Sequence, residues 1–112
     1  MSKLNIYLPA TNWSAATRRT LQVGGNGGVT AILPGDVRVG VADLTAPFEV
    51  PLDLRRVAFE GVTGQHVDVT ITDYSGDISD ASKRGNASSG SFNFVDVVDS
   101  NTPQKPALLN AE

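Results

Sequence analysis

Three aspartates in one short stretch, Asp73, Asp77 and Asp80, are the residues that most resemble a chemical site, with Gly76 among them. Hard cations such as Ca²⁺ bind several oxygens that converge from one loop, and calcium loops are rich in aspartate and glycine. The stretch lacks the alternating ligands of an EF-hand loop, and no bidentate glutamate follows it. Because aspartate and glycine are also the usual residues of turns and helix caps, we favour a turn over a metal site.

Other catalytic arrangements are missing from the sequence. His66 is the single histidine, whereas zinc sites and acid–base relays use several partners. It follows Gln65 at an outward position of a predicted strand, which favours a surface or interface role. No serine lies in a Gly-x-Ser-x-Gly elbow or begins a Ser-x-x-Lys pair. The glycine-rich run 24–28 leads into a predicted strand without the lysine of a P-loop. We therefore predict a protein that is not an enzyme and has no cofactor and no metal.

The overall composition indicates one small domain. The 112 residues include no cysteine, so neither disulfides nor thiolate ligands stabilise the fold. Nine basic against twelve acidic residues give a net charge of −3, which argues against nucleic-acid binding. No apolar run approaches the ~20 residues of a membrane helix, and the first nine residues lack the apolar core of a signal peptide. We expect a protein that binds neither nucleic acid nor membrane.

Alternation of apolar and polar residues recurs along the chain and predicts β-strands. Every second residue is apolar in four segments, which are Leu4–Leu8, Val37–Val41, Phe48–Leu54 and Val67–Ile71. Glycines and prolines are spread along the whole length, as turns between short strands require. This predicts an all-β fold, a single small β-sandwich or barrel that is mostly antiparallel. We assign residues 1–100 to this β domain and residues 101–112 to an extended C-terminal tail.

Turn residues predict where the strands are joined. Gly24–Gly28 and Gly61–Gly64 each lie between two apolar segments, and we predict both to be hairpin tips. Pro34–Asp36 is predicted to be a tight turn, since proline presets φ and glycine tolerates positive φ. Between Leu54 and Val57 the alternation changes phase, which a β-bulge in one bent strand would explain.

Two segments have the composition of short helical turns. Asn12–Arg19 begins with a capping asparagine, and Ser79–Gly85 has polar residues at its start, cations near its end and glycine after them. Gly85–Ser91 is polar and predicted to be a loop. In the next segment, Phe92–Val98, the apolar residues change parity between Phe94 and Val95, which predicts a strand that is either bulged or buried on both faces.

Five residues are candidate contacts with a partner protein. Trp13 lies in a polar segment after the first predicted strand, where it is either an interface anchor or a core residue. Leu108 and Leu109 end a tail that contains two prolines, and they either latch onto a groove of another subunit or fold back onto the domain itself. Arg55 and Arg56 are adjacent cations suited to ion pairs with a neighbouring subunit, since aromatics for base stacking are few.

The sequence combines several general features: a short opening strand Lys3–Leu8, the loop Gly24–Gly28, alternating strands, no cysteine, and the tail Pro103–Glu112. In these features the chain resembles the small all-β structural proteins of tailed bacteriophages, in particular capsid decoration or cement proteins. No single motif is diagnostic. Such proteins commonly sit as trimers on junctions between capsid proteins. The resemblance therefore implies a homo-oligomeric virion protein, made in the host cytoplasm, that binds and stabilises an assembled shell.

A carbohydrate- or receptor-binding β-sandwich is the alternative function. Its site would use Trp13, Tyr74 and the loop Asp73–Asp80, with calcium assisting. Sugar binding needs exposed aromatic rings near polar hydrogen-bonding groups, and Tyr74 beside Asp73 is the one adjacent pair. An enzyme built on Asp68, Asp73 or Asp77 has the least support, because these acids occupy predicted turn and surface positions.

Overall fold

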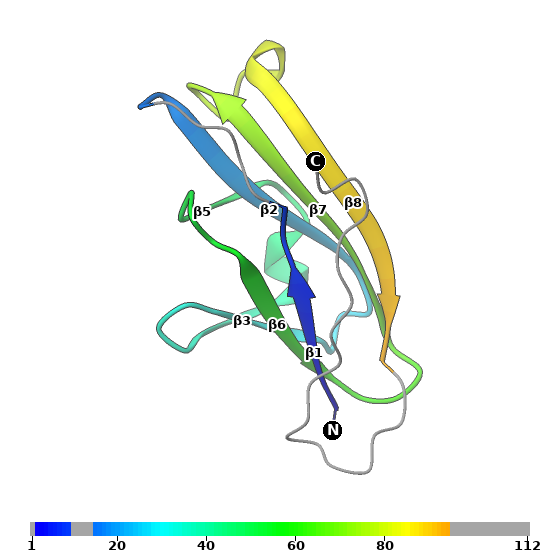
Figure 1. Cartoon of the computed structure of the whole chain (residues 1–112). Coiled ribbons are helices and arrows are strands. Elements are labelled where there is room, and N and C mark those ends of the chain that lie inside the picture. Colours follow the sequence, from blue (N-terminus) through cyan, green and yellow to red (C-terminus); the bar gives the residue numbers. More distant parts are fainter. Residues whose placement is uncertain (1, 10–14, 95–112) are drawn as a thin grey trace.

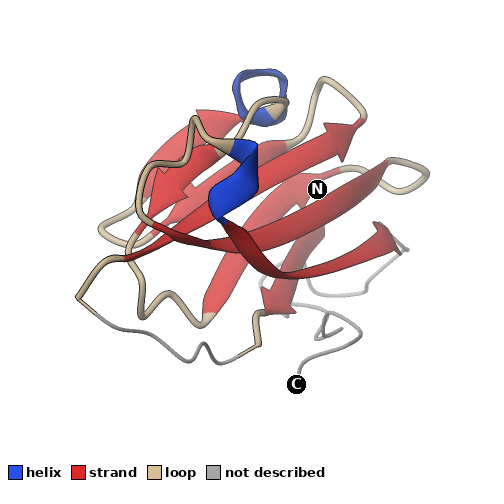
Figure 2. Cartoon of the chain, turned by 90° about the horizontal axis from the view of Figure 1, so that it is seen from above, coloured by secondary structure: helices blue, strands red, loops and turns tan. Residues whose placement is uncertain are grey.

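The strands form two antiparallel four-stranded sheets around a shared apolar core. A computed structural model describes residues 2–9 and 15–94 (Figure 1). The first sheet has the order β1 (Ser2–Tyr7), β6 (Arg56–Gly61), β3 (Thr30–Leu33) and β4 (Val37–Gly40); the second has the order β5 (Phe48–Val50), β2 (Thr17–Gly25), β7 (His66–Ser75) and β8 (Arg84–Asn93). Figure 2 shows how little of the described chain is helical. The predicted all-β, antiparallel sandwich is confirmed.

The core comes from the apolar residues of both sheets. Leu4 and Ile6 of β1 pack in one cluster with Val67, Val69 and Ile71 of β7, and all five are at most 2% exposed. These are the inward positions that the alternation predicts, because neighbouring side chains of a strand point to opposite faces. Full burial of such a side chain contributes roughly 1.5–3 kcal/mol. The two faces therefore hold the sheets together without any covalent link.

The alternation fails in the segment 37–41. Val37 is 51% exposed, because it begins the edge strand β4 next to the turn. Val39 is only partly buried, and Val41 is buried as the first residue of a 3₁₀ helix, η1 (Val41–Leu44). The turn itself is as predicted: Gly35 and Asp36 have φ of 81° and 60° and connect β3 to β4.

The two glycine-rich loops are not hairpin tips. Gly24–Gly28 connects β2 of the second sheet to β3 of the first, and Gly61–Gly64 connects β6 of the first sheet to β7 of the second. The two crossings are linked, since the Asn26 backbone N–H donates to the His66 carbonyl at 3.1 Å. Turn composition marks where a strand ends, but the next strand is free to pair in either sheet.

The predicted bulge between Leu54 and Val57 is also a crossing between sheets. β5 ends at Val50 in the second sheet, and β6 begins at Arg56 in the first. The phase of the alternation changes because the chain leaves one sheet through a turn, closed by the bond from the Leu54 N–H to the Pro51 carbonyl at 3.0 Å. Leu54 is buried in this turn, whereas Phe48 is 39% exposed.

The helix and loop predictions have mixed outcomes. A second 3₁₀ helix, η2 (Ala81–Lys83), forms where predicted, with the Asp80 carboxylate accepting from the Ser82 N–H at 3.0 Å. The predicted helix Asn12–Arg19 is wrong from Thr17 onward, where β2 pairs with β7. The predicted loop Gly85–Ser91 is wrong as well, because it pairs with β7 as part of β8. In both segments, backbone pairing with β7 overrides the preference of the local composition.

Part of the prediction lies outside the described residues. Trp13, residues 95–98 of the predicted last strand, and the tail with Leu108 and Leu109 belong to this part. Within the described chain, no helix is long and apolar enough to span a membrane.

Candidate protein interface

The outer face of the first sheet carries one of the two arginines predicted to contact a partner. Arg56 is the first residue of β6 and lies opposite Tyr7 of β1. Two residues further along β6 is Ala58, which pairs with Ile32 of β3. Val57 lies between Arg56 and Ala58 in β6 and is buried in the core. Because neighbouring side chains of a strand point to opposite faces, Arg56, Ala58 and their partners Tyr7 and Ile32 point away from the core.

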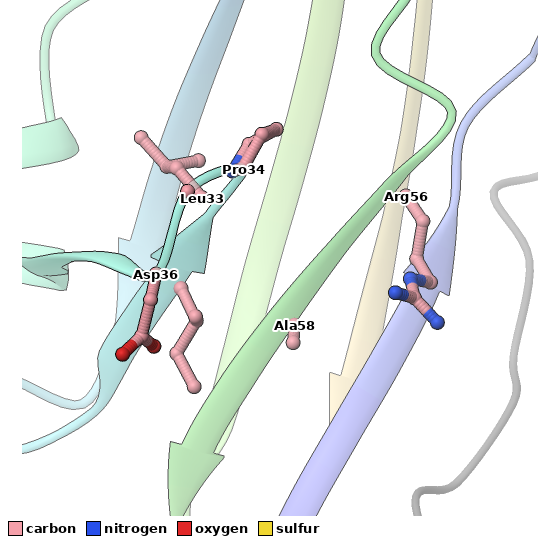
Figure 3. A pocket seen from close by; sticks show the side chains of 7 residues that line it. Leu33, Pro34, Asp36, Arg56 and Ala58 are labelled. Atoms are coloured by element: carbon pink, nitrogen blue, oxygen red, sulfur yellow. The ribbon is translucent and has the colours of Figure 1, made fainter.

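An open cavity of about 350 Å³ lies over this face beside the turn that joins β3 to β4. Figure 3 shows Arg56 at one side of the cavity, Asp36 at the other and Ala58 between them. Ile32 and Pro34 add apolar lining. A partner that docks here meets a cation, an anion and an apolar floor.

Most of the charges on this face are compensated within the sheet. Arg38 of β4 donates to the Glu60 carboxylate of β6 at 2.5 Å, and its Nε lies 3.8 Å from Asp36. Lys3 of β1 approaches the same Glu60 at 3.9 Å. The hydrogen bond to Glu60 raises the pKa of Arg38 above its ordinary value. The charges of these four residues therefore balance one another.

The adjacent arginines Arg55 and Arg56 do not take part in this charge network. Both side chains are exposed. Within residues 2–9 and 15–94, neither side chain makes an ion pair with a carboxylate. The Arg55 carbonyl accepts from the Leu8 N–H at 2.8 Å, which holds β1 to the start of β6. Arg56 is thus a positive charge without a compensating anion in the described sheet, placed next to apolar surface.

A third arginine, Arg19, has the opposite environment, and its burial was not predicted from the sequence. Arg19 of β2 is 1% exposed and shares the inward face of Leu21 and Val23. Its guanidinium donates to the carbonyl of Leu54 at 3.1 Å and to that of Pro9, both of which adjoin strands of the first sheet. Arg19 therefore ties the two sheets together at one end of the sandwich.

The carboxylate of Asp73 completes this tie from β7, where it lies opposite Arg19. The Arg19 Nε is 3.4 Å from the Asp73 Oδ1. Burial lowers the pKa of Arg19; Asp73 counteracts this shift, and the charge of Arg55 adds to it. Arginine stays protonated nonetheless, because its ordinary pKa lies far above neutrality. Had a strand been predicted from Thr17, the alternation would have placed Arg19 on the same inward face as Leu21 and Val23. The composition of this segment favoured a helix instead.

The three aspartates singled out in the sequence do not converge on one site. Asp73 faces Arg19, and the Asp77 Oδ1 accepts from both the N–H and the hydroxyl of Ser79 at 2.9 Å. These bonds lower the pKa of Asp77. Asp80 caps η2. Among the described residues, no group of three or more histidines, aspartates and glutamates is placed to hold a metal ion.

Tyr74, the described aromatic residue of the expected sugar site, is buried in the fold; Trp13 lies outside the described residues. Tyr74 is 3% exposed, and the Arg84 guanidinium lies 5.9 Å from the centre of its ring. A buried ring offers no face for a sugar to stack on. His66 stands at a partly exposed position of β7, with its Nε2 3.6 Å from the Asp68 carboxylate. Its surface position agrees with the sequence prediction.

Comparison with protein-family models, curated proteins and solved structures finds no match to this chain.

Proposed function

We propose that this protein is a non-enzymatic structural subunit that binds and stabilises an assembled protein shell, in the manner of a capsid decoration protein of a virion. The outer face of the first sheet is its contact surface. The observation that carries the proposal is Arg56, an exposed cation with no ion-pair partner among the described residues, beside the apolar floor of Ala58 and Ile32.

The chemistry of this face suits a protein partner. Tyrosine and arginine are enriched among the residues that dominate binding free energy, and Tyr7, 37% exposed, lies directly opposite Arg56. A guanidinium binds a carboxylate through two parallel hydrogen bonds. The complementary surface is therefore an acidic side chain flanked by apolar ones. A small, stiff sheet loses little conformational freedom when it binds such a surface.

Stabilisation of a shell follows from mass action. A subunit that binds only the assembled lattice adds its binding free energy to the intact state. Many copies on one particle multiply this effect even if each copy binds weakly.

The test uses intact particles from the virus or cell that encodes the chain. The particles are depleted of the protein, labelled protein is titrated back, and the bound fraction is measured by sedimentation. Arg56→Glu should weaken binding roughly tenfold or more, as expected for an arginine hot spot. The control is Lys83→Glu, the same reversal of charge at an exposed site on η2. If the protein is missing from particles, or if both variants bind alike, the proposal is wrong.

A further inference from the structure

The outer edges of the two sheets differ in how they are protected against unwanted pairing. β5 has three residues between Pro47 and Pro51, and β4 has four, including Arg38. β1 carries Lys3 and is followed by Pro9. β8 has ten residues, and from residue 85 to residue 93 it contains no charge and no proline. Short length, charge and proline are the usual means of protecting an edge, and most of β8 has none of them.

The backbone groups of this edge are directed outward in a regular pattern. The Phe94 N–H donates to the Gln65 carbonyl at 2.9 Å, so this residue faces β7. Because backbone groups alternate in direction along an antiparallel strand, those of Ser89 and Ser91 point away from β7. In the part of the chain that the structure describes, no strand pairs with that side of β8.

We propose that a second copy of this chain pairs with this edge. Residues 87–93 of two copies run antiparallel about a two-fold axis at Gly90, which makes one eight-stranded sheet. Ser89 of each copy then lies opposite Ser91 of the other and exchanges backbone hydrogen bonds with it. An edge that pairs with itself has two-fold symmetry and gives a dimer, in place of the trimer that the resemblance to decoration proteins implies.

The register proposed for the two copies of β8 follows from the regular part of the strand and from the side chains on its inner face. The pairing of β7 with β8 is irregular between Thr72 and Tyr74, so regular alternation in β8 holds from residue 87 onward. On the inner face of this stretch, Phe92 is only partly buried and Gly90 has no side chain. In the proposed register, Phe92 of the second copy lies diagonally across from Gly90, where an aromatic ring covers the exposed backbone. No charges oppose each other.

The sequence favours a second copy of β8 over the C-terminal segment as the occupant. Pro103 and Pro106 cannot donate to a β-ladder, and only three apolar residues, Val95, Val97 and Val98, lie between Phe94 and these prolines, with the charged Asp96 among them. A copy of β8 matches the edge in length by construction. The proposal does not depend on Arg56, which lies on the other sheet.

The first experiment compares the molar mass of the full chain with that of Ser89→Pro and of Ser89→Thr by light scattering. Ser89→Pro removes an N–H that points away from β7, so the fold keeps its β7–β8 bonds while the dimer loses two of its own, one from each copy. We expect a dimer for the wild type and for Ser89→Thr, and a monomer for Ser89→Pro with an unchanged circular dichroism spectrum. A wild-type monomer or trimer overturns the proposal.

A cross-linking experiment tests the register even if the proline variant fails to fold. The chain has no cysteine, so single substitutions give specific probes. Directly paired residues have Cα atoms about 5.5 Å apart, within the range of a disulfide. Under mild oxidation an equimolar mixture of Ser89→Cys and Ser91→Cys should form a cross-linked dimer, whereas neither variant alone should. Absence of the mixed cross-link, or equal cross-linking of Ser89→Cys alone, overturns the proposed register and axis.

Discussion

An arginine in each of two regions of the sandwich has a different role, one in holding the fold together and the other in the proposed binding of a partner. Arg19 joins the two sheets at one end of the sandwich (the closed end), where it is buried, donates to the carbonyls of Pro9 and Leu54 and forms an ion pair with Asp73. On the outer face of the first sheet, Arg56 is exposed and has no ion-pair partner among the described residues. A buried charge must be satisfied within the protein, or it costs several kcal/mol. An exposed charge is satisfied by water and is available to a partner.

The comparison teaches that the partners of an arginine, more than its presence, indicate its role. Arg18 and Arg19 are adjacent, yet Arg18 is half-exposed with its Nε 3.9 Å from Glu49, whereas Arg19 ties the sheets together. We expect the closed end to govern stability and the outer face to govern binding.

Removing the buried arginine should have the largest effect on stability. Arg19→Met removes the cation of the ion pair with Asp73 and the donor of two carbonyls, and it should lower the free energy of unfolding by about 3–5 kcal/mol. Urea titration measures this loss. Arg18→Met is the matched control and should change stability by about 0.5 kcal/mol or less. Equal losses in the two variants would contradict the role assigned to the closed end.

Reversing the exposed arginine should separate binding from folding. Arg56→Glu should change the free energy of unfolding by no more than about 0.5 kcal/mol, because nothing in the described fold depends on its charge. The same urea titration measures this, alongside the particle-binding assay. A large loss of stability would show that the outer face also holds the fold together, and the division between the two regions would fail.

The charge network beside Arg56 should contribute only at low salt. Arg38→Gln removes the ion pair with Glu60 and should lower the thermal midpoint slightly in dilute buffer. The difference should vanish at 1 M salt, where the screening length is about 3 Å. A loss that persists at high salt would mean that packing, and not charge, holds these strands together.

The smallest effect should come from Asp77, which stabilises a turn. Hydrogen bonds from Ser79 lower the pKa of Asp77 in the folded protein. The stabilising contribution is therefore present above the ordinary carboxyl pKa and is lost as pH falls through the lowered value. Asp77→Asn should be slightly less stable than the wild type at neutral pH and should show a shallower loss on acidification. Denaturation midpoints across the acidic range measure this, and parallel pH curves would contradict it.

The strands could be predicted from the sequence because alternation is a local property. Leu4, Ile6, Val67 and Ile71 lie in the core as their spacing indicates. The polar strand β8 could not be predicted, because serine and glycine form a strand only where β7 supplies the backbone partners. For the candidate site, the sequence placed Arg55 and Arg56 at the surface but could not show the apolar floor that Ile32 contributes from another strand.

Local patterns in the sequence predicted the all-β class, most of the apolar faces and the tight turn Pro34–Asp36, since each depends on residues close together in the chain. Long-range packing set the rest: two glycine-rich loops cross between sheets, Arg19 is buried beside Asp73, and β8 is the last strand of the second sheet in the described part of the chain. These features join residues tens of positions apart. The free energies of these features depend on burial and on backbone pairing, which cannot be predicted from a local sequence pattern.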